Sequence, residues 1–291
     1  MDTVPDGGRR PYDAGVVLNR GVSLTRKGKE AMEMNLSRQF KLKRDQIWVL
    51  IAKDFKLKYN STALGFLWSL LVPTLTSAVY YFVFGVMMRF QAQNYLLYLM
   101  SGTFLWQFFA NVIMMNGAVL TANQGLLKKT SFDRELLVRG TFYTESIHFL
   151  LTVPVLLGMM ACYRVMPSPL LAIPNLVVSL LALQLLSVGV SYFYSACNLY
   201  FRDLERIMGI VMMMWMFCSP VFIPVSSVPE KYLWIYNINP MAPILQIWRD
   251  IFYVPGWHPQ YFLPLLAACT AVFLLGRMVF RKMEPGFAEM M

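Results

Sequence analysis

Charged side chains are scarce in this sequence, and several long stretches lack them entirely. Only 14% of the 291 residues are charged, whereas 57% are apolar. Such a composition excludes a typical soluble domain and indicates a polytopic membrane protein. The stretches without Lys, Arg, Asp or Glu run from Lys58 to Arg89, Arg89 to Lys128, Arg164 to Arg202, Arg206 to Glu230 and Asp250 to Arg277.

Motifs for nucleotide binding and catalysis are also missing. No GxxxxGK(S/T) loop occurs, so the chain does not bind ATP through a Walker motif. Neither GxSxG nor HExxH is found, and no pair of carboxylates comes within reach of a common site. We therefore expect no catalytic residue, no metal site and no cofactor in this chain. Glu145 is the one acidic residue inside the predicted spans, which disfavours an ion-coupled carrier.

The uncharged stretches predict an all-α membrane protein with six transmembrane helices, because about 20 residues cross the hydrocarbon. A sixth stretch, from Arg139 to Arg164, is interrupted only by Glu145. The spans are expected near residues 64–88, 95–120, 141–162, 171–199, 207–225 and 259–280. Together with their loops they form a predicted permease domain over residues 63–291.

Lys and Arg are distributed unequally between the two sides of this topology. With the amino terminus inside, the inner segments hold 22 of the 26 Lys and Arg residues. This bias places both termini in the cytoplasm. The formal charge of +10 then reflects orientation and the membrane surface, and no nucleic-acid partner is expected. The polar first 30 residues contain no apolar signal-peptide core.

Small and sulfur-containing residues within the spans are expected to serve packing. Ser187, Ser191 and Ser195 recur every four residues, which lets neighbouring helices approach closely. The four cysteines lack CxxC spacing and are interpreted as reduced packing residues: Cys162, Cys197, Cys218 and Cys269.

The segment before the first span predicts an amphipathic helix at the membrane interface, over residues 39–62. Ile47, Ile51 and Phe55 recur every four positions, and Lys and Asp side chains fill much of the other face. Residues 1–38 are interpreted as a flexible cytosolic extension. Two roles remain open for the helix: a basic membrane anchor, or a site where Lys53, Lys56 and Lys58 contact the phosphates of a lipid-linked substrate.

The third span contains an ionisable pair, Glu145 and His148, at i and i+3 on one helical face. A Glu-x-x-His pair occurs in carboxylate-bridged metal sites, but these need further Glu ligands that the other spans lack. The remaining alternatives are structural pairing and a role in gating or substrate passage.

An aromatic segment of residues 226–256 follows the fifth span on the outer side. It is too polar to cross the bilayer, and its backbone amides cannot lie unpaired in lipid. Two short re-entrant or interfacial helices, with a turn at Asn239–Pro240, would satisfy them. Trp234, Tyr236 and Trp248 would then lie at headgroup depth. The segment would form either a plain aromatic belt or a structured rim around an exit.

Several motifs together resemble one protein family. "KYNSTALGFLWSLLVPTL" leads into the first span, "FRD" follows the fourth and "SPVFIPVSSVPEKYLWIYNINPM" follows the fifth. Met283-Glu284-Pro285 begins an ending similar to "EPxFA". This set resembles the type-2 ABC transporter permeases, specifically those that export O-antigen and related polysaccharides, including teichoic acids. The resemblance covers residues 40–291.

The resemblance implies a homodimer in the bacterial inner membrane, joined to two copies of a separate ATPase that binds ATP and Mg. It implies a substrate glycan attached to undecaprenyl diphosphate. The loop of residues 121–140 would be the coupling and gating element that contacts the ATPase, through Lys128, Lys129, Phe132, Arg134 and Glu135. Without the resemblance, this loop could equally be a plain connector.

Aromatic side chains are candidates to line the path of such a glycan, since their faces stack on sugar rings while polar tips accept water. Fewer than half of them are expected to touch sugar. The candidates are Tyr80, Tyr81, Phe84, Tyr98, Trp106, Trp215 and Phe217.

Two rival functions compete with glycan export. An integral membrane glycosyltransferase or polymerase would need acidic catalytic residues at the membrane surface, and the outer loops offer only Glu230 and Asp250. A permease of the same superfamily could instead export drugs or other lipids. The early amphipathic helix and the outer "NINPM" segment favour the glycan exporters, by resemblance.

Overall fold

A computed structural model describes residues 26–59, 65–90, 92–127, 132–165, 168–253, 256–288 and 290. Side chains are described for these residues except 26–40 and 288. The chain divides into two units, residues 1–43 and residues 44–291. Of the first unit, the beginning of helix α1 (Arg26–Tyr59) is described. The second unit contains the rest of α1 and all the later helices.

Every regular element among the described residues is helical, as the sequence predicts. After α1 the order is η1 (Gly65–Leu67), α2 (Trp68–Tyr80), the π-helix η2 (Tyr81–Met87), α3 (Tyr95–Gly117), α4 (Val119–Ala122), α5 (Gln124–Leu127), α6 (Glu135–Cys162), α7 (Pro169–Tyr200), α8 (Leu204–Phe217), η3 (Val225–Ser227), η4 (Glu230–Tyr232), α9 (Leu233–Ile238), α10 (Met241–Phe252), η5 (Pro259–Tyr261), α11 (Phe262–Met283) and η6 (Glu284–Ala288).

Five of the six predicted spans correspond to helices that are long and apolar enough to cross a membrane. These are Gly65–Met87, Tyr95–Gly117, Glu135–Cys162, Pro169–Tyr200 and Pro259–Phe287. The third starts earlier than predicted, because the segment from Glu135 to residue 140 is helical and continuous with the span.

The predicted fifth span, residues 207–225, differs from the structure. Helix α8 has 14 residues and ends at Phe217, and residues 218–223 form turns and bends. At about 1.5 Å per residue, α8 is about 21 Å long, short of the roughly 30 Å hydrocarbon core. Pro220 and Pro224 follow its end and prevent the helix from continuing to residue 225. A sixth crossing helix therefore stays a prediction.

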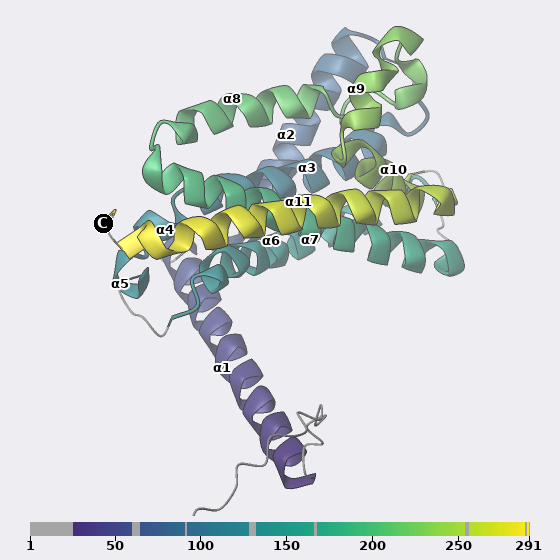
Figure 1. Ribbon diagram of the computed structural model, residues 1–291. Helices are drawn as coiled ribbons and strands as arrows, with labels where there is room; N and C mark the ends of the chain where they lie inside the picture. Colours follow the sequence, from purple (N-terminus) through teal and green to yellow (C-terminus); the bar gives the residue numbers. More distant parts are fainter. Residues whose placement is uncertain are drawn as a thin grey trace, which may run out of the picture. The chain divides into compact units, whose positions relative to one another are not determined.

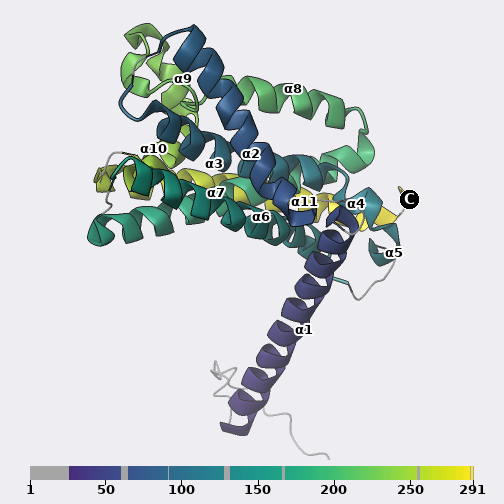
Figure 2. The same cartoon turned by 180° about the vertical axis from the view of Figure 1, so that it is seen from behind.

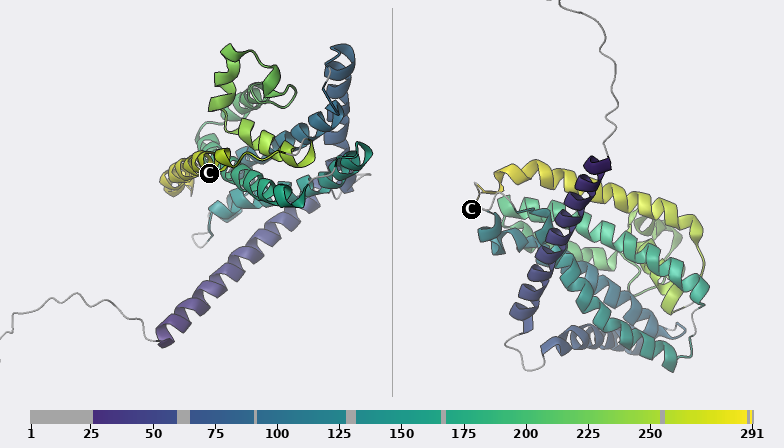
Figure 3. Two further views of the ribbon diagram at one scale, coloured as in Figure 1. Left: turned by 90° about the vertical axis from the view of Figure 1, so that its right-hand side faces the viewer. Right: turned by 90° about the horizontal axis from the view of Figure 1, so that it is seen from below.

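Helices α7 and α11 form the most extensive helix pair of the second unit. They lie side by side in Figures 1 and 2, and the right-hand view of Figure 3 shows α11 as one uninterrupted helix. A Cβ atom on Gly189 would lie 2.6 Å from the Phe273 backbone, so the glycine permits this close approach. Ser187, Ser191 and Ser195 are fully buried, which confirms their predicted packing role.

Helix α3 is the central helix of the bundle. Most of its side chains are buried, against α2, α6, α7 and α10. By contrast, α2 and α11 are mostly exposed although strongly apolar, so their free faces suit lipid or a second protein copy. The end of α11 lies beside α4 and α5 (Figures 1 and 2).

Helix α1 is longer than the predicted interface helix. It begins at Arg26 and so includes part of the segment interpreted as a flexible extension, whereas residues 1–25 lie outside the described residues. In its second half, Leu50 and Ile51 are buried and Phe55 is half-buried, which confirms an apolar face. Its position at the membrane interface stays a prediction.

The segment of residues 226–256 contains the two short helices that the sequence predicts, α9 and α10. The turn between them is at Asn239 and Pro240. The side chain of Asn239 fixes this turn: its Oδ1 accepts hydrogen bonds from Trp215 Nε1 at 2.8 Å and from the Met241 amide at 2.9 Å. Its Nδ2 donates to the Cys218 carbonyl and to Ser219 Oγ. The re-entrant position of these helices stays a prediction.

Candidate functional site

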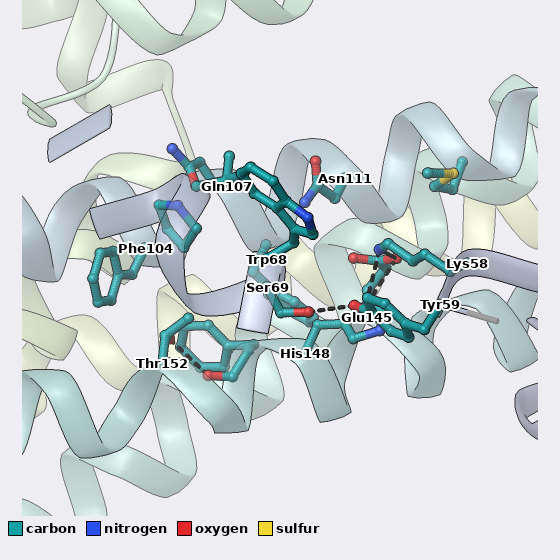
Figure 4. Close-up of a pocket in the computed structure, with 15 residues that line it drawn as sticks. Lys58, Tyr59, Trp68, Ser69, Phe104, Gln107, Asn111, Glu145, His148 and Thr152 are labelled. Carbon is teal, nitrogen blue, oxygen red and sulfur yellow. Dashed lines mark hydrogen bonds and ion pairs between the residues drawn. The ribbon is translucent and has the colours of Figure 1, made fainter. Parts of the chain in front are cut away.

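A polar pocket lies where the end of α1 meets α2, α3 and α6. Its volume is about 410 Å³. Polar side chains converge on it from all four helices (Figure 4): Lys58, Ser69, Gln107, Asn111, Glu145 and His148. The rest of its wall is aromatic and aliphatic, and includes Trp68, Phe104 and Phe149. This combination of an apolar wall with a few convergent polar groups is typical of ligand sites.

The charged centre of the pocket joins helices α1 and α6. Lys58 Nζ lies 3.1 Å from Glu145 Oε1 and 3.2 Å from His148 Nδ1. Glu145 and His148 are 4% and 6% exposed, and Glu145 Oε1 lies 3.3 Å from His148 Nδ1. This contact confirms the prediction that Glu145 and His148 lie on the same face of their helix. The ammonium group beside both residues occupies the place of a further ligand and disfavours a metal ion.

The imidazole of His148 packs against two aromatic rings of α1 but is not fully hydrogen-bonded. The ring centroids of Phe55 and Tyr59 lie 4.7 and 5.5 Å away. Nε2 is buried and has no hydrogen-bond partner among the described residues. A buried polar atom left in that condition costs about 1–3 kcal/mol.

The opposite wall of the pocket carries two amides, Gln107 and Asn111, one turn apart on α3. Neither side chain makes a hydrogen bond to any residue that the structure describes. Figure 4 shows both amides beside the indole of Trp68. Tyr59 and Ser69 are hydrogen-bonded to each other through their hydroxyl groups on the side nearer α1. The pocket therefore offers free donors and acceptors next to an aromatic face.

The three lysines proposed for a lipid diphosphate differ in their surroundings. Lys53 donates to Asn123 Oδ1 at 2.6 Å and lies 3.5 Å from Asp54 Oδ1. Lys58 is paired with Glu145, whereas Lys56 is exposed and forms no ion pair among the described residues. Burial raises the pKa of the Asp54 carboxyl, an effect that Lys53 opposes. The lysines thus do not act as one equivalent cluster.

The predicted coupling residues are mostly engaged within the chain. Lys128 and Lys129 lie outside the described residues. Phe132 is half-buried against the core, and Arg134 donates to the carbonyls of Glu284 at 2.6 Å and Leu127 at 3.2 Å.

Glu135, the last predicted coupling residue, is buried rather than available on the surface. It is 3% exposed and lies 3.0 Å from Arg139, 2.9 Å from Arg277 and 2.6 Å from Arg281. Tyr192 also donates to it, at 3.4 Å. We call these five residues the Glu135 cluster. The sequence reasoning missed Arg277, Arg281 and Tyr192, because nothing local links residues so far apart.

Two of the predicted path-lining aromatics belong to the core. Tyr98 and Trp106 are each 3% exposed. Tyr98 donates to the Pro220 carbonyl at 3.0 Å and lies under the Arg249 guanidinium, 3.6 Å from ring centroid to Cζ. Trp106 packs edge-on against Trp215. In this chain neither of these two rings can present a face to a sugar.

The other aromatic candidates lie nearer the surface. Tyr80 and Phe84 are half-buried and pack on Phe222, with centroids 4.8 and 5.0 Å away. Tyr81 and Phe217 are exposed, and the half-buried indole of Trp215 is bonded to Asn239. These five remain available for a role at a surface.

Arg249, on α10, is a residue whose importance the sequence does not reveal. It is 6% exposed and donates to the carbonyls of Pro220 and of Val221, the latter at 2.9 Å. These carbonyls follow the end of α8 and have no helical partner. Trp248, predicted at headgroup depth, is instead 1% exposed and donates to the Ser101 carbonyl. Trp234 is exposed, as a position in the predicted aromatic belt requires.

Comparison with known proteins gives consistent matches along most of the chain. Residues 45–253 match the family described as "ABC-2 type transporter". The chain is 34% identical over 267 residues to the "O-antigen export system permease protein RfbA" of Klebsiella pneumoniae, covering 89% of this chain and 98% of that protein. It is 28% identical to the protein of the same name in Myxococcus xanthus, covering 82% and 93%. The "Polysialic acid transport protein KpsM" of Escherichia coli is 23% identical, covering 84% and 96%.

Proposed function

Because the chain belongs to the ABC-2 type transporter family, we propose that two copies of it form the membrane conduit for a glycan carried on undecaprenyl diphosphate. The chain is the permease component of a type-2 ABC exporter for O-antigen or a related polysaccharide, and it is a transport subunit rather than an enzyme. The observation that carries the polysaccharide assignment is its similarity, over nearly its whole length, to O-antigen export permeases. The conduit lies in the bacterial inner membrane, with both termini in the cytoplasm.

The energy for export comes from a separate ATPase subunit that contacts the loop of residues 121–140. The absence of a Walker loop from this sequence supports a separate source of energy. Since Glu135 ties the beginning of α6 to α11 through Arg277 and Arg281, force on the loop would be transmitted to both helices. The Glu135 cluster is thus a transmission element behind the coupling surface, to which Phe132 contributes a predicted apolar contact.

The conduit forms between two copies of the chain rather than inside one. The exposed apolar faces of α2 and α11 support such an arrangement, because part of that surface can meet a second copy. Tyr80, Tyr81 and Phe84 lie along one end of the first span and would line the path, with Trp215 and Phe217 on α8. Lys56, which is exposed and forms no ion pair with a described residue, is the best placed of the three for the substrate's diphosphate.

The test is export in cells that lack their own O-antigen permease. The chain is expressed together with an ABC ATPase subunit of an O-antigen exporter, and surface glycan is measured by gel and by antibody. Restored surface glycan supports the proposal. A matched strain, in which the Walker lysine of the ATPase is replaced, should retain glycan inside the cell. Export that continues with this inactive ATPase would contradict the separate energy source.

A further inference from the structure

We propose that the pocket between α1, α2, α3 and α6 binds a neutral, hydroxyl-rich ring, such as one sugar unit. The binding site itself is inferred from the pocket's chemistry. The identification of that ring as part of the exported glycan rests on the proposed function. The site lies within one copy of the chain and uses residues different from the aromatic path candidates.

The charges in the pocket favour a neutral ligand over an anion. Lys58 is the one lysine or arginine among the lining residues, and Glu145 already pairs with it at 3.1 Å. A phosphate placed near Lys58 would also meet the carboxylate of Glu145, and this repulsion offsets the attraction. The ion pair thus leaves little net charge with which to hold an anion.

The polar wall disfavours an acyl chain. An apolar chain in this space would cover the two amides, the ammonium group and the imidazole without bonding any of them. Burying such groups unpaired is unfavourable, so a ligand that donates and accepts hydrogen bonds is preferred. Hydroxyl groups do both, and a sugar carries several around one ring.

The positions of the free groups suit a ring with polar edges and an apolar face. Gln107 and Asn111 lie on one side of the pocket, beside Trp68, and Glu145 lies on the side of α6. The second oxygen of Glu145 forms no hydrogen bond with the described residues, since Lys58 and His148 both contact Oε1. Trp68 is 44% exposed and provides a flat face on which a pyranose can stack.

The decisive variant is the double substitution Gln107→Leu with Asn111→Leu. Both side chains make no hydrogen bond to the described residues, so their removal should leave folding unchanged. Gln184→Leu is the matched control, because Gln184 is a half-buried glutamine on α7 outside the pocket. The full chain, with its ATPase, is purified in sugar-free detergent and placed in phospholipid nanodiscs.

The probe is octyl glucoside, added below its micelle concentration, and the readouts are tryptophan fluorescence and the unfolding temperature. We expect saturable binding to the wild type and to the Gln184→Leu control, and about tenfold weaker binding to the double variant, equivalent to one or two hydrogen bonds. An octyl sulfobetaine should not bind saturably. Equal glucoside binding by the wild type and the double variant, or equal binding of the sulfobetaine, would overturn the proposal.

Export separates this inference from the proposed function. If the double variant folds, binds the glucoside weakly and exports less glycan, both stand. If the wild type binds the glucoside but exports no glycan with its ATPase, the proposed function fails and the pocket stands. If the wild type exports glycan while the double variant binds and exports equally well, the pocket assignment fails alone.

Discussion

Two carboxylates on the same helix, Glu135 and Glu145 of α6, have opposite surroundings. Glu135 is bonded by Arg139, Arg277, Arg281 and Tyr192, so both of its oxygens are engaged. Glu145 is bonded through one oxygen and borders a pocket of about 410 Å³. The first is saturated by its own chain and the second is not. Burial of a charged residue therefore does not by itself indicate a ligand site; unsatisfied bonding capacity beside a cavity is the better indication.

Among the substitutions that test this comparison, Glu135→Gln should cause the largest loss of stability. The substitution leaves three arginines without their shared counter-ion, and breaking a buried ion pair costs about 3–5 kcal/mol. We expect a value near the lower limit, about 3 kcal/mol, since Arg281 is 56% exposed. Thermal unfolding in nanodiscs and the abundance of the variant in membranes measure this loss of stability. Glu284→Gln, whose pair with Arg134 is 4.0 Å long, is the control and should cost under about 0.5 kcal/mol. Equal losses for both would contradict the structural role of the Glu135 cluster.

A smaller effect is expected from Glu145→Gln, which removes one partner of a pair whose lysine is 38% exposed. The loss of stability should be about 1 kcal/mol. Glucoside binding should weaken by a larger factor than in the Gln184→Leu control. A double-mutant cycle with Lys58→Gln gives the coupling energy between the two residues. No coupling would show that the ion pair does not form in the membrane.

Lys56→Gln separates a substrate contact from a structural one. Because Lys56 is exposed and forms no ion pair with described residues, its loss should leave the unfolding temperature unchanged. If it meets the substrate diphosphate, export should fall several-fold, and Lys56→Arg should restore it. Lys41→Gln, also exposed on α1, provides the comparison. Normal export by Lys56→Gln would remove Lys56 from the proposed path.

The smallest expected effect is the contribution of Asp250, on α10, to the pH dependence of the protein's stability. Burial raises the pKa of its carboxyl from 3.8 to about 6, although His258 acts in the opposite direction. The folded protein therefore binds this proton more strongly than the unfolded chain. The contribution to stability is full below about pH 4 and is lost as the pH rises to about 6. Asp250→Asn should flatten the unfolding temperature over this interval. An unchanged slope would exclude Asp250 as its source.

The sequence predicted the helices better than it predicted their partners. Five spans, the apolar face of α1 and the turn at Asn239–Pro240 agree with the structure, because periodicity and proline placement are local signals. The resemblance to type-2 ABC permeases is confirmed by the family match. The end of α8 at Phe217 was missed, since an apolar run continues past the residue where helical bonding stops.

The predicted site was less accurate, for a physical reason that particular residues show. Tyr98, Trp106 and Trp248 have the composition of a sugar-lining or interfacial surface, yet all three are buried. An aromatic side chain packs equally well in a core, at an interface or against a sugar, so its type alone does not choose between them. Glu135 resembled an exposed coupling residue because two of its three arginines, Arg277 and Arg281, come from another helix.

The sequence by itself determined that this chain is a helical membrane protein and indicated the family to which it belongs. Those properties follow from apolar runs and from motifs that neighbouring residues carry. Tertiary structure alone decided that Lys58 meets Glu145 and His148, that Arg277 and Arg281 neutralise Glu135, and that Gln107 and Asn111 face a pocket. Such contacts join residues that are distant along the chain, and only helix packing brings them within the few ångströms over which hydrogen bonds and ion pairs form.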